Sequence, residues 1–233
     1  TIAQIQENPL VSLVGTGGMG KSRIAIEVAH QLKETFEGIY FCDLSNTTTE
    51  MGLLAKIAKS MGLELVNQDP LEQLTQVFIN MRVLLILDNL EQILKPCVSV
   101  IGHWVNKCPH LRILTTTRLR LRLPFEQCVV LNPLTEFEAL ELFEVRGREV
   151  NPSFQIHEGN REILGKMIQE LDCLPLAIEL AASRLNILTA SEIGLRLSER
   201  FSILRSRTGT VQPLDAALDW SWEMLSSNAK HVF

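Results

Sequence analysis

The sequence predicts an α/β protein, in which a parallel sheet carries helices on both faces and is followed by a helical region. Three observations predict this class. Up to about residue 131, short β-rich runs alternate with amphipathic helical stretches. One of these runs, Val83–Leu87, is hydrophobic at every position, as expected of a strand buried on both faces. After Pro133 the strand signal ends and only helical patterns follow.

The individual elements follow from hydrophobic periodicity. The expected strands are Val11–Val14, Gly38–Leu44, Val83–Leu87, Arg112–Thr116 and Cys128–Leu131. Apolar residues at three- and four-residue spacing predict helices between them, at Lys21–Glu34, Met51–Ser60, Leu71–Asn80 and Glu91–Asn106. The same spacing predicts the later helices Glu136–Arg148, Asn160–Leu171, Pro175–Leu188 and Ser191–Phe201.

These elements divide the chain into an α/β domain at 1–132, a helical domain at 133–205 and a third region at 206–233. The third region begins with a polar stretch, Arg205–Gln212, which predicts a linker. Pro213 then opens another expected helix that runs to about Leu225. Because the chain begins at Thr1 and ends within a helical pattern, we expect it to be part of a longer protein.

The composition excludes several functional classes. With 46% hydrophobic and 21% charged residues, the chain has the composition of a soluble globular protein. Its net charge of -5 gives no overall attraction to nucleic acid. The apolar runs are shorter than the roughly 20 residues of a membrane-spanning helix. The five cysteines include no C-x-x-C pair, which favours a reducing, cytoplasmic location.

The sharpest motif matches G-x-x-x-x-G-K-[ST] and stands between an expected buried strand and an expected helix. Its residues are Gly15, Thr16, Gly17, Gly18, Met19, Gly20, Lys21 and Ser22. Glycines let backbone N–H groups converge on phosphate oxygens, and the helix directs its positive end at the same anion. Lys21 adds a charge for the β- and γ-phosphates, Ser22 offers a hydroxyl to Mg²⁺, and Arg23 continues the predicted nucleotide-binding set.

This motif has two other interpretations. A glycine-rich turn followed by a lysine does not account for both flanking elements. A dinucleotide site fits G-x-G-x-x-G at Gly15, Gly17 and Gly20, with Asp43 as the ribose-binding acid. The adjacent Lys21 and Ser22 decide against it, because a dinucleotide site has no use for them.

A second expected strand ends in an acidic residue. Val83–Leu87 leads into Asp88, the pattern of a Walker B element whose carboxylate holds Mg²⁺ or its water. Asn89 stands where many ATPases place the acid that activates water, and an amide cannot accept that proton. Glu91 is the nearest replacement, and the alternative that it is only an exposed acid in the first turn of a helix stays open.

Arg118 follows the expected strand Arg112–Thr116, whose carboxyl end faces the same crevice as its neighbours in a doubly wound sheet. We therefore expect it to contact phosphate. Arg120 and Arg122 alternate with leucines, so a basic strand for nucleic acid is one interpretation. A solvated edge is the favoured one, because no aromatic residues are interleaved.

These motifs together resemble the STAND ATPases of the NB-ARC class, which includes apoptosome and plant resistance proteins, with bacterial transcription regulators as the most similar relatives. The P-loop NTPase motif, the Leu-Leu-Ile-Leu-Asp-Asn-Leu-Glu strand end and Thr-Thr-Thr-Arg carry the likeness. It continues through Leu131-Asn132-Pro133-Leu134, the helix Ala139–Phe143, Leu174-Pro175-Leu176-Ala177 and Leu218-Asp219-Trp220-Ser221-Trp222, and covers nearly the whole chain.

The resemblance implies a P-loop nucleotide-binding domain, a helical lid and the start of a winged-helix domain, with ATP or ADP and Mg²⁺ bound between the first two. It implies that Pro175 lies against the adenine and that Arg118 is a sensor near the γ-phosphate. From the residues alone, Pro175 would only open a helix. Cys173 stands where the family usually has glycine, and the Gly-Arg-Glu element before the first strand is missing.

The implied function is a conformational switch that ATP hydrolysis resets slowly, with Lys21, Asp88, Glu91 and Arg118 as the catalytic candidates. Expected partners are adenine nucleotide, other regions of the same protein and, in the ATP state, further copies of the chain. Two alternatives remain: a P-loop kinase, for which no acceptor pocket is recognisable, and the ATPase portion of a DNA-binding regulator. Direct nucleic-acid binding by this chain is not expected, because residues 213–233 contain one Lys and no Arg.

Overall fold

The computed structural model describes residues 1–66 and 69–208, and the chain divides into two compact units. The first contains Thr1–Thr16 and Lys21–Leu131, and the second contains Gly17–Gly20 together with the chain from Asn132 onward. The expected winged-helix start, including the helix from Pro213, lies outside the described residues. No helix in the described ranges is both long enough and apolar enough to cross a membrane.

The first unit contains a five-stranded parallel sheet in the order β2-β3-β4-β1-β5. Its strands are β1 (Leu10–Val14), β2 (Gly38–Asp43), β3 (Val83–Asp88), β4 (Arg112–Thr117) and β5 (Glu126–Val130). Its helices are α1 (Ile2–Glu7), α2 (Lys21–Leu32), α3 (Glu50–Ser60), α4 (Pro70–Asn80) and α5 (Leu94–Lys107), with a short 3-10 turn, η1 (Leu90–Gln92). The expected α/β class is confirmed.

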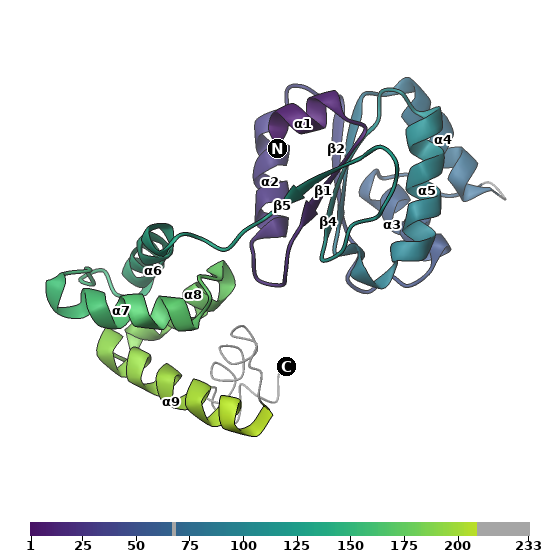
Figure 1. Cartoon of the computed structure of the whole chain (residues 1–233). Helices are drawn as coiled ribbons and strands as arrows, with labels where there is room; N and C mark the ends of the chain where they lie inside the picture. The colour runs from purple at the N-terminus through teal and green to yellow at the C-terminus, as the bar shows by residue number, and fades with distance from the viewer. Residues whose placement is uncertain (67–68, 209–233) are drawn as a thin grey trace. The chain divides into compact units, whose positions relative to one another are not determined.

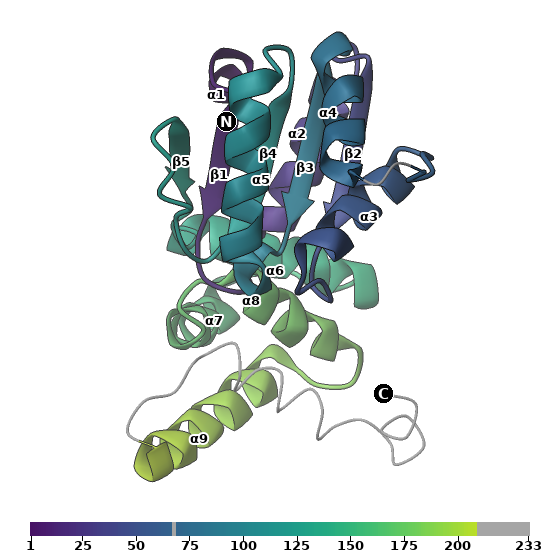
Figure 2. The same ribbon diagram turned by 90° about the vertical axis from the view of Figure 1, so that its right-hand side faces the viewer.

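Helices cover both faces of the sheet (Figure 1). Every residue of β3 is buried, and its side chains alternate between two apolar clusters: Leu84 and Ile86 join α1 and α2, whereas Leu85 and Leu87 join α3, α4 and α5. Figure 2 shows α4 and α5 lying side by side over the second face. This two-sided burial explains the uninterrupted hydrophobic run in the sequence.

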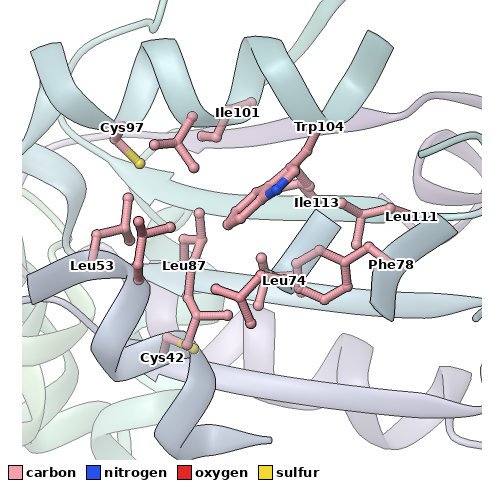
Figure 3. Close-up of a cluster of buried hydrophobic side chains, with 14 of the residues drawn as sticks. Cys42, Leu53, Leu74, Phe78, Leu87, Cys97, Ile101, Trp104, Leu111 and Ile113 are labelled. Carbon is pink, nitrogen blue, oxygen red and sulfur yellow. The ribbon is translucent and has the colours of Figure 1, made fainter. Parts of the chain in front are cut away.

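The cluster beneath α4 and α5 is mainly aliphatic and contains one aromatic pair, Phe78 and Trp104 (Figure 3). The rings of Phe78 and Trp104 meet edge to face, with centroids 5.1 Å apart. The Trp104 indole Nε1 donates a hydrogen bond of 3.0 Å to Thr75 Oγ1 inside this cluster. The polar atom of the large ring is therefore paired at the point where the two helices pack.

The second unit is helical in the described residues. It contains α6 (Glu136–Val150), α7 (Glu158–Glu170), α8 (Pro175–Ala182), a 3-10 segment η2 (Ser183–Asn186) and α9 (Ala190–Thr208). A capping box at Thr135 and Glu138 starts α6. Phe143 and Phe154 pack edge to face with centroids 5.7 Å apart.

Several boundaries differ from the sequence expectations. The helix α1 was not predicted, and the expected helix Glu91–Asn106 is divided at Ile93 into η1 and α5. The expected helix Pro175–Leu188 is likewise divided, because α8 gives way to η2 at Ser183. The first part of the linker expected at Arg205–Gln212 is helical, since α9 continues to Thr208, and the rest of that stretch lies outside the described residues.

Candidate nucleotide-binding site

The loop Gly15–Gly20 connects the carboxyl end of β1 to the first residue of α2. Gly18 and Gly20 have φ angles of 77° and 82°, a region that residues with a side chain rarely adopt. Gly15 N–H donates to the carbonyl of Thr117, 3.2 Å away, so the loop starts in line with the sheet. The loop thus ends at a helix N-terminus, where unpaired N–H groups and the helix dipole favour an anion.

Lys21 is the first residue of α2, and its side chain folds back over the loop. Its ammonium Nζ donates to the carbonyl oxygens of Gly15 and Thr16, each 2.8 Å away. Only 8% of Lys21 is exposed. Burial lowers the pKa of Lys21, the nearby Glu91 carboxylate opposes this shift, and the Arg118 charge adds to it. The predicted phosphate-binding cation is therefore held at the loop by its own backbone.

Ser22 and Asp88, the two predicted Mg²⁺ ligands, lie in direct contact. The Ser22 hydroxyl lies 2.8 Å from Asp88 Oδ1 and 2.9 Å from Oδ2, and it donates to this carboxylate across 66 residues of sequence. Asp88 is the last residue of β3 and is only 4% exposed. A hydroxyl and a carboxylate oxygen are thus paired beside the phosphate loop.

Thr116 is a site residue that sequence reasoning missed. It lies on β4 next to β3, is fully buried, and its hydroxyl donates to Asp88 Oδ1. Thr116 Oγ1 also accepts a hydrogen bond of 3.0 Å from the backbone N–H of Asn89. Its signal in the sequence was a run of three threonines at the end of an expected strand, because hydroxyls that are buried at such a point need polar partners.

Asn89 has a left-handed backbone, with φ 61° and ψ 56°. Its side-chain amide donates to Asp88 Oδ2 at 3.2 Å and reaches Asp43 Oδ1 at 3.5 Å. Asp43, the acid of the rejected dinucleotide interpretation, lies opposite Asp88 in the β2–β3 register. The amide therefore separates two carboxylates that would otherwise repel each other.

Glu91 and Arg118 form an ion pair. Arg118 Nε lies 3.3 Å from Glu91 Oε1, with Arg118 just after β4 and Glu91 in η1. Both were predicted to follow the carboxyl ends of strands, although their direct pairing was not predicted. Arg120 and Arg122 are exposed and lie in irregular structure after β4, which agrees with a solvated edge and not with a basic strand.

Arg23 and Pro175 are the remaining residues of the predicted nucleotide-binding set. Arg23 is exposed on α2. Pro175 opens α8 in the second unit, as its local sequence predicts. Its role against adenine stays a prediction of the resemblance.

The residues present fit a magnesium ion. Among the described residues, no group of three or more His, Cys, Asp or Glu side chains could hold a metal ion by itself. The protein would supply the oxygens of Ser22 and Asp88 alone. Mg²⁺ commonly takes one or two protein oxygens and completes its shell with phosphate and water.

Comparison with known families identifies a domain family in this sequence. The NB-ARC domain family matches residues 2–150, which is more than half of the chain. The chain belongs to the NB-ARC family. This NB-ARC chain is therefore a nucleotide-binding domain of the STAND class of P-loop NTPases, and the resemblance seen in the sequence is confirmed.

Similar proteins include bacterial regulators, as expected. A Mycobacterium tuberculosis protein that carries the name of an HTH-type transcriptional regulator is 34% identical over 238 residues, covering 99% of this chain and 27% of that protein. Regulatory protein AfsR of Streptomyces coelicolor is 27% identical over 228 residues, covering 91% of this chain and 22% of AfsR. The NB-ARC chain thus spans about a quarter of the length of these relatives.

The fold also matches solved structures. The STAND protein with a tetratricopeptide repeat sensor from Pyrococcus horikoshii aligns with a TM-score of 0.55 and 17% identity, covering 99% of this chain and 32% of that one. At this identity the likeness shows the fold alone. It confirms a P-loop sheet followed by a helical region.

Proposed function

We propose that the NB-ARC chain binds ATP and ADP with Mg²⁺ at its phosphate loop and hydrolyses ATP slowly, as the switch of a longer regulatory protein. One observation carries this proposal. The Ser22 hydroxyl of the phosphate-loop motif lies 2.8 Å from Oδ1 of Asp88, the acidic residue of the second motif. Both lie beside the loop to which the buried Lys21 is hydrogen-bonded. This is the combination that a Mg²⁺-bound phosphate requires.

Each residue has a separate role in the proposal. The loop N–H groups and the α2 N-terminus bind phosphate oxygens, and Lys21 supplies the full positive charge. Ser22 and Asp88 would hold Mg²⁺, which neutralises phosphate charge when bound. Arg118 responds to the terminal phosphate, and Glu91 is the candidate for positioning water.

A switch requires two states that bind the nucleotides with different affinity, because a ligand shifts an equilibrium only through its differential affinity. The names of the relatives support a regulatory role over the phosphotransfer alternative. They also favour the second candidate, in which this domain is the ATPase portion of a DNA-binding regulator. A salt-dependent DNA shift assay on the complete parent protein tests that candidate.

The test of the nucleotide site is Lys21→Ala, measured by calorimetry with ATP and with ADP. A charge-assisted hydrogen bond contributes about 1.5–3 kcal/mol, so we expect affinity for both nucleotides to fall about 10- to 100-fold. Lys33→Ala is the matched control, because it removes an exposed lysine just beyond the far end of α2. Unchanged binding by Lys21→Ala would show that the site has been assigned wrongly.

A further inference from the structure

The ion pair between Arg118 and Glu91 lies among the residues of the proposed phosphate site. Both side chains act electrostatically on Lys21, Glu91 raising its pKa and Arg118 lowering it. Of these two charges, that of Glu91 has the larger influence on the pKa of Lys21. Lys21 is bonded to the carbonyls of the loop and Arg118 is paired with Glu91, so both cations already have partners.

The backbone on both sides of this pair is fixed. On the Glu91 side, the N–H of Asn89 is bonded to Thr116, and the left-handed turn at Asn89 leads directly into η1. On the Arg118 side, Thr117 Oγ1 donates to the carbonyl of Leu119 at 2.8 Å and accepts its N–H at 3.2 Å. The two chain segments are held, so a change of partner needs only side-chain rotation.

The two side chains differ in exposure. The Arg118 side chain is 65% exposed, whereas that of Glu91 is 26% exposed. An exposed ion pair is weak, and a guanidinium with one edge in solvent keeps donors for another anion. Arg118 can therefore exchange its partner, while Glu91 stays in place.

We propose that Glu91 sets the preference of the site between ATP and ADP by competing with the terminal phosphate for the Arg118 guanidinium. This inference rests on the proposed function. With ADP, Arg118 keeps its bond to Glu91. With ATP, the third phosphate offers Arg118 a more highly charged partner, and the bond to Glu91 is given up. Glu91 thus acts as a positioning residue that lowers the preference for ATP.

The experiment is a double-mutant cycle on nucleotide selectivity. Calorimetry measures the Kd for ADP divided by the Kd for ATP in the unmodified chain, Glu91→Gln, Arg118→Ala and the double variant. Coupling in exposed ion pairs corresponds to roughly 2- to 5-fold in an equilibrium constant, so Glu91→Gln should raise the ratio by about that factor. Arg118→Ala should bring the ratio towards one, and adding Glu91→Gln to it should change nothing further.

Glu72→Gln is the matched control. Glu72 also forms an exposed ion pair, with Lys107 at 3.6 Å. Lys107 is the last residue of α5 and precedes the start of β4, at the end of the sheet opposite the phosphate loop. The ratio for this variant should equal that of the unmodified chain. Thermal denaturation of each variant establishes that the fold is kept.

The outcomes separate this inference from the proposed function. If Glu91→Gln raises the ratio equally with and without Arg118, Glu91 acts only as a distant negative charge and the competition is refuted. If Glu91→Gln leaves the ratio unchanged while nucleotide still binds through Lys21, the inference fails and the proposed function stands. If the unmodified chain binds neither nucleotide, both fail.

Discussion

The backbone conformation at Cys173 explains which type of residue is favoured at this position. Cys173 follows α7 with φ 52°, next to Asp172 with φ 50°. Asp172 N–H bonds to the Gln169 carbonyl and Cys173 N–H to that of Ile168, at 3.0 and 3.1 Å, which is a Schellman motif. In this motif the left-handed residue is Asp172, and Cys173, the residue after it, is left-handed as well. Glycine adopts this geometry without a steric cost, which gives a physical reason for the glycine expected at position 173.

We expect Cys173→Gly to stabilise the second unit. Left-handed backbone costs a residue with a side chain about 1–2 kcal/mol, and the greater freedom of glycine in the unfolded chain offsets part of this gain. The net increase in the free energy of unfolding should be about 0.5–1 kcal/mol, measured by denaturant titration.

Cys128→Gly is the control for this substitution, because Cys128 lies in the extended strand β5. Glycine inside a strand is destabilising, so this variant should lose about 0.5–1 kcal/mol. Equal effects of the two substitutions would contradict the role assigned to the backbone of Cys173.

The residue types in the sequence predicted only some of the contacts among the site residues. The proximity of Ser22 and Asp88 agrees with two motifs at the carboxyl ends of β1 and β3, because the carboxyl ends of parallel strands face the same crevice even though β4 lies between these two strands. The bonds of Thr116 to Asp88 and to Asn89 depend on strand register and on the left-handed turn, which local sequence does not encode. The ion pair of Glu91 with Arg118 depends on the same turn.

Among the elements, burial decided which boundaries could be predicted. The strand β3 is buried throughout, and its expected range needed only the addition of Asp88. The strand β5 lies at the edge of the sheet and is only partly buried, so its range shifted from Cys128–Leu131 to Glu126–Val130. The helix α1 has six residues and no side-chain cap, which is too short for periodicity to be recognised.

The packing of α4 against α5 provides a prediction at this scale. Thr75→Val keeps the side-chain volume but removes the acceptor of the Trp104 indole N–H, which is 3.0 Å away in the core of Figure 3. A buried donor without a partner costs about 1–3 kcal/mol, so the free energy of unfolding should fall by that amount.

Thr75→Ser is the matched control, because it retains the hydroxyl oxygen that accepts this bond. It loses one methyl group and should cost about 1 kcal/mol or less. Chemical denaturation followed by Trp fluorescence measures both variants. A smaller loss for Thr75→Val than for Thr75→Ser would show that methyl packing outweighs the hydrogen bond.

For the whole molecule, the family match and the site geometry support a nucleotide-dependent switch whose output lies in the longer protein. The chain spans about a quarter of its named relatives, so the rest of such a protein would receive the signal. A switch of this kind must hold its nucleotide longer than an ordinary enzyme holds its substrate.

We therefore expect slow turnover of ATP by the whole chain. Asn89 stands at the position of the usual general base but donates its amide hydrogens to Asp88 and Asp43. General acid–base help contributes typically about 10²–10⁴-fold, so its loss should hold turnover well below about 1 s⁻¹. Phosphate release by purified protein measures this rate, with Lys21→Ala as the control for contaminating ATPases. Rapid multiple turnover that Lys21→Ala abolishes would refute the slow switch.

Two variants show what limits that rate. If Glu91 positions water, Glu91→Gln should lower hydrolysis measured at saturating ATP, whereas a carboxylate that serves only Arg118 should leave the saturated rate unchanged.

Asn89→Asp supplies a carboxylate at the usual position and should raise the rate. It also places a third negative charge beside Asp88 and Asp43, which are joined now by the Asn89 amide. The gain should therefore appear only at raised Mg²⁺, because the added cation offsets the repulsion. A titration of Mg²⁺ at fixed ATP measures both effects, and an Asn89→Asp variant that stays as slow as the unmodified chain at every Mg²⁺ concentration would show that the missing base does not limit hydrolysis.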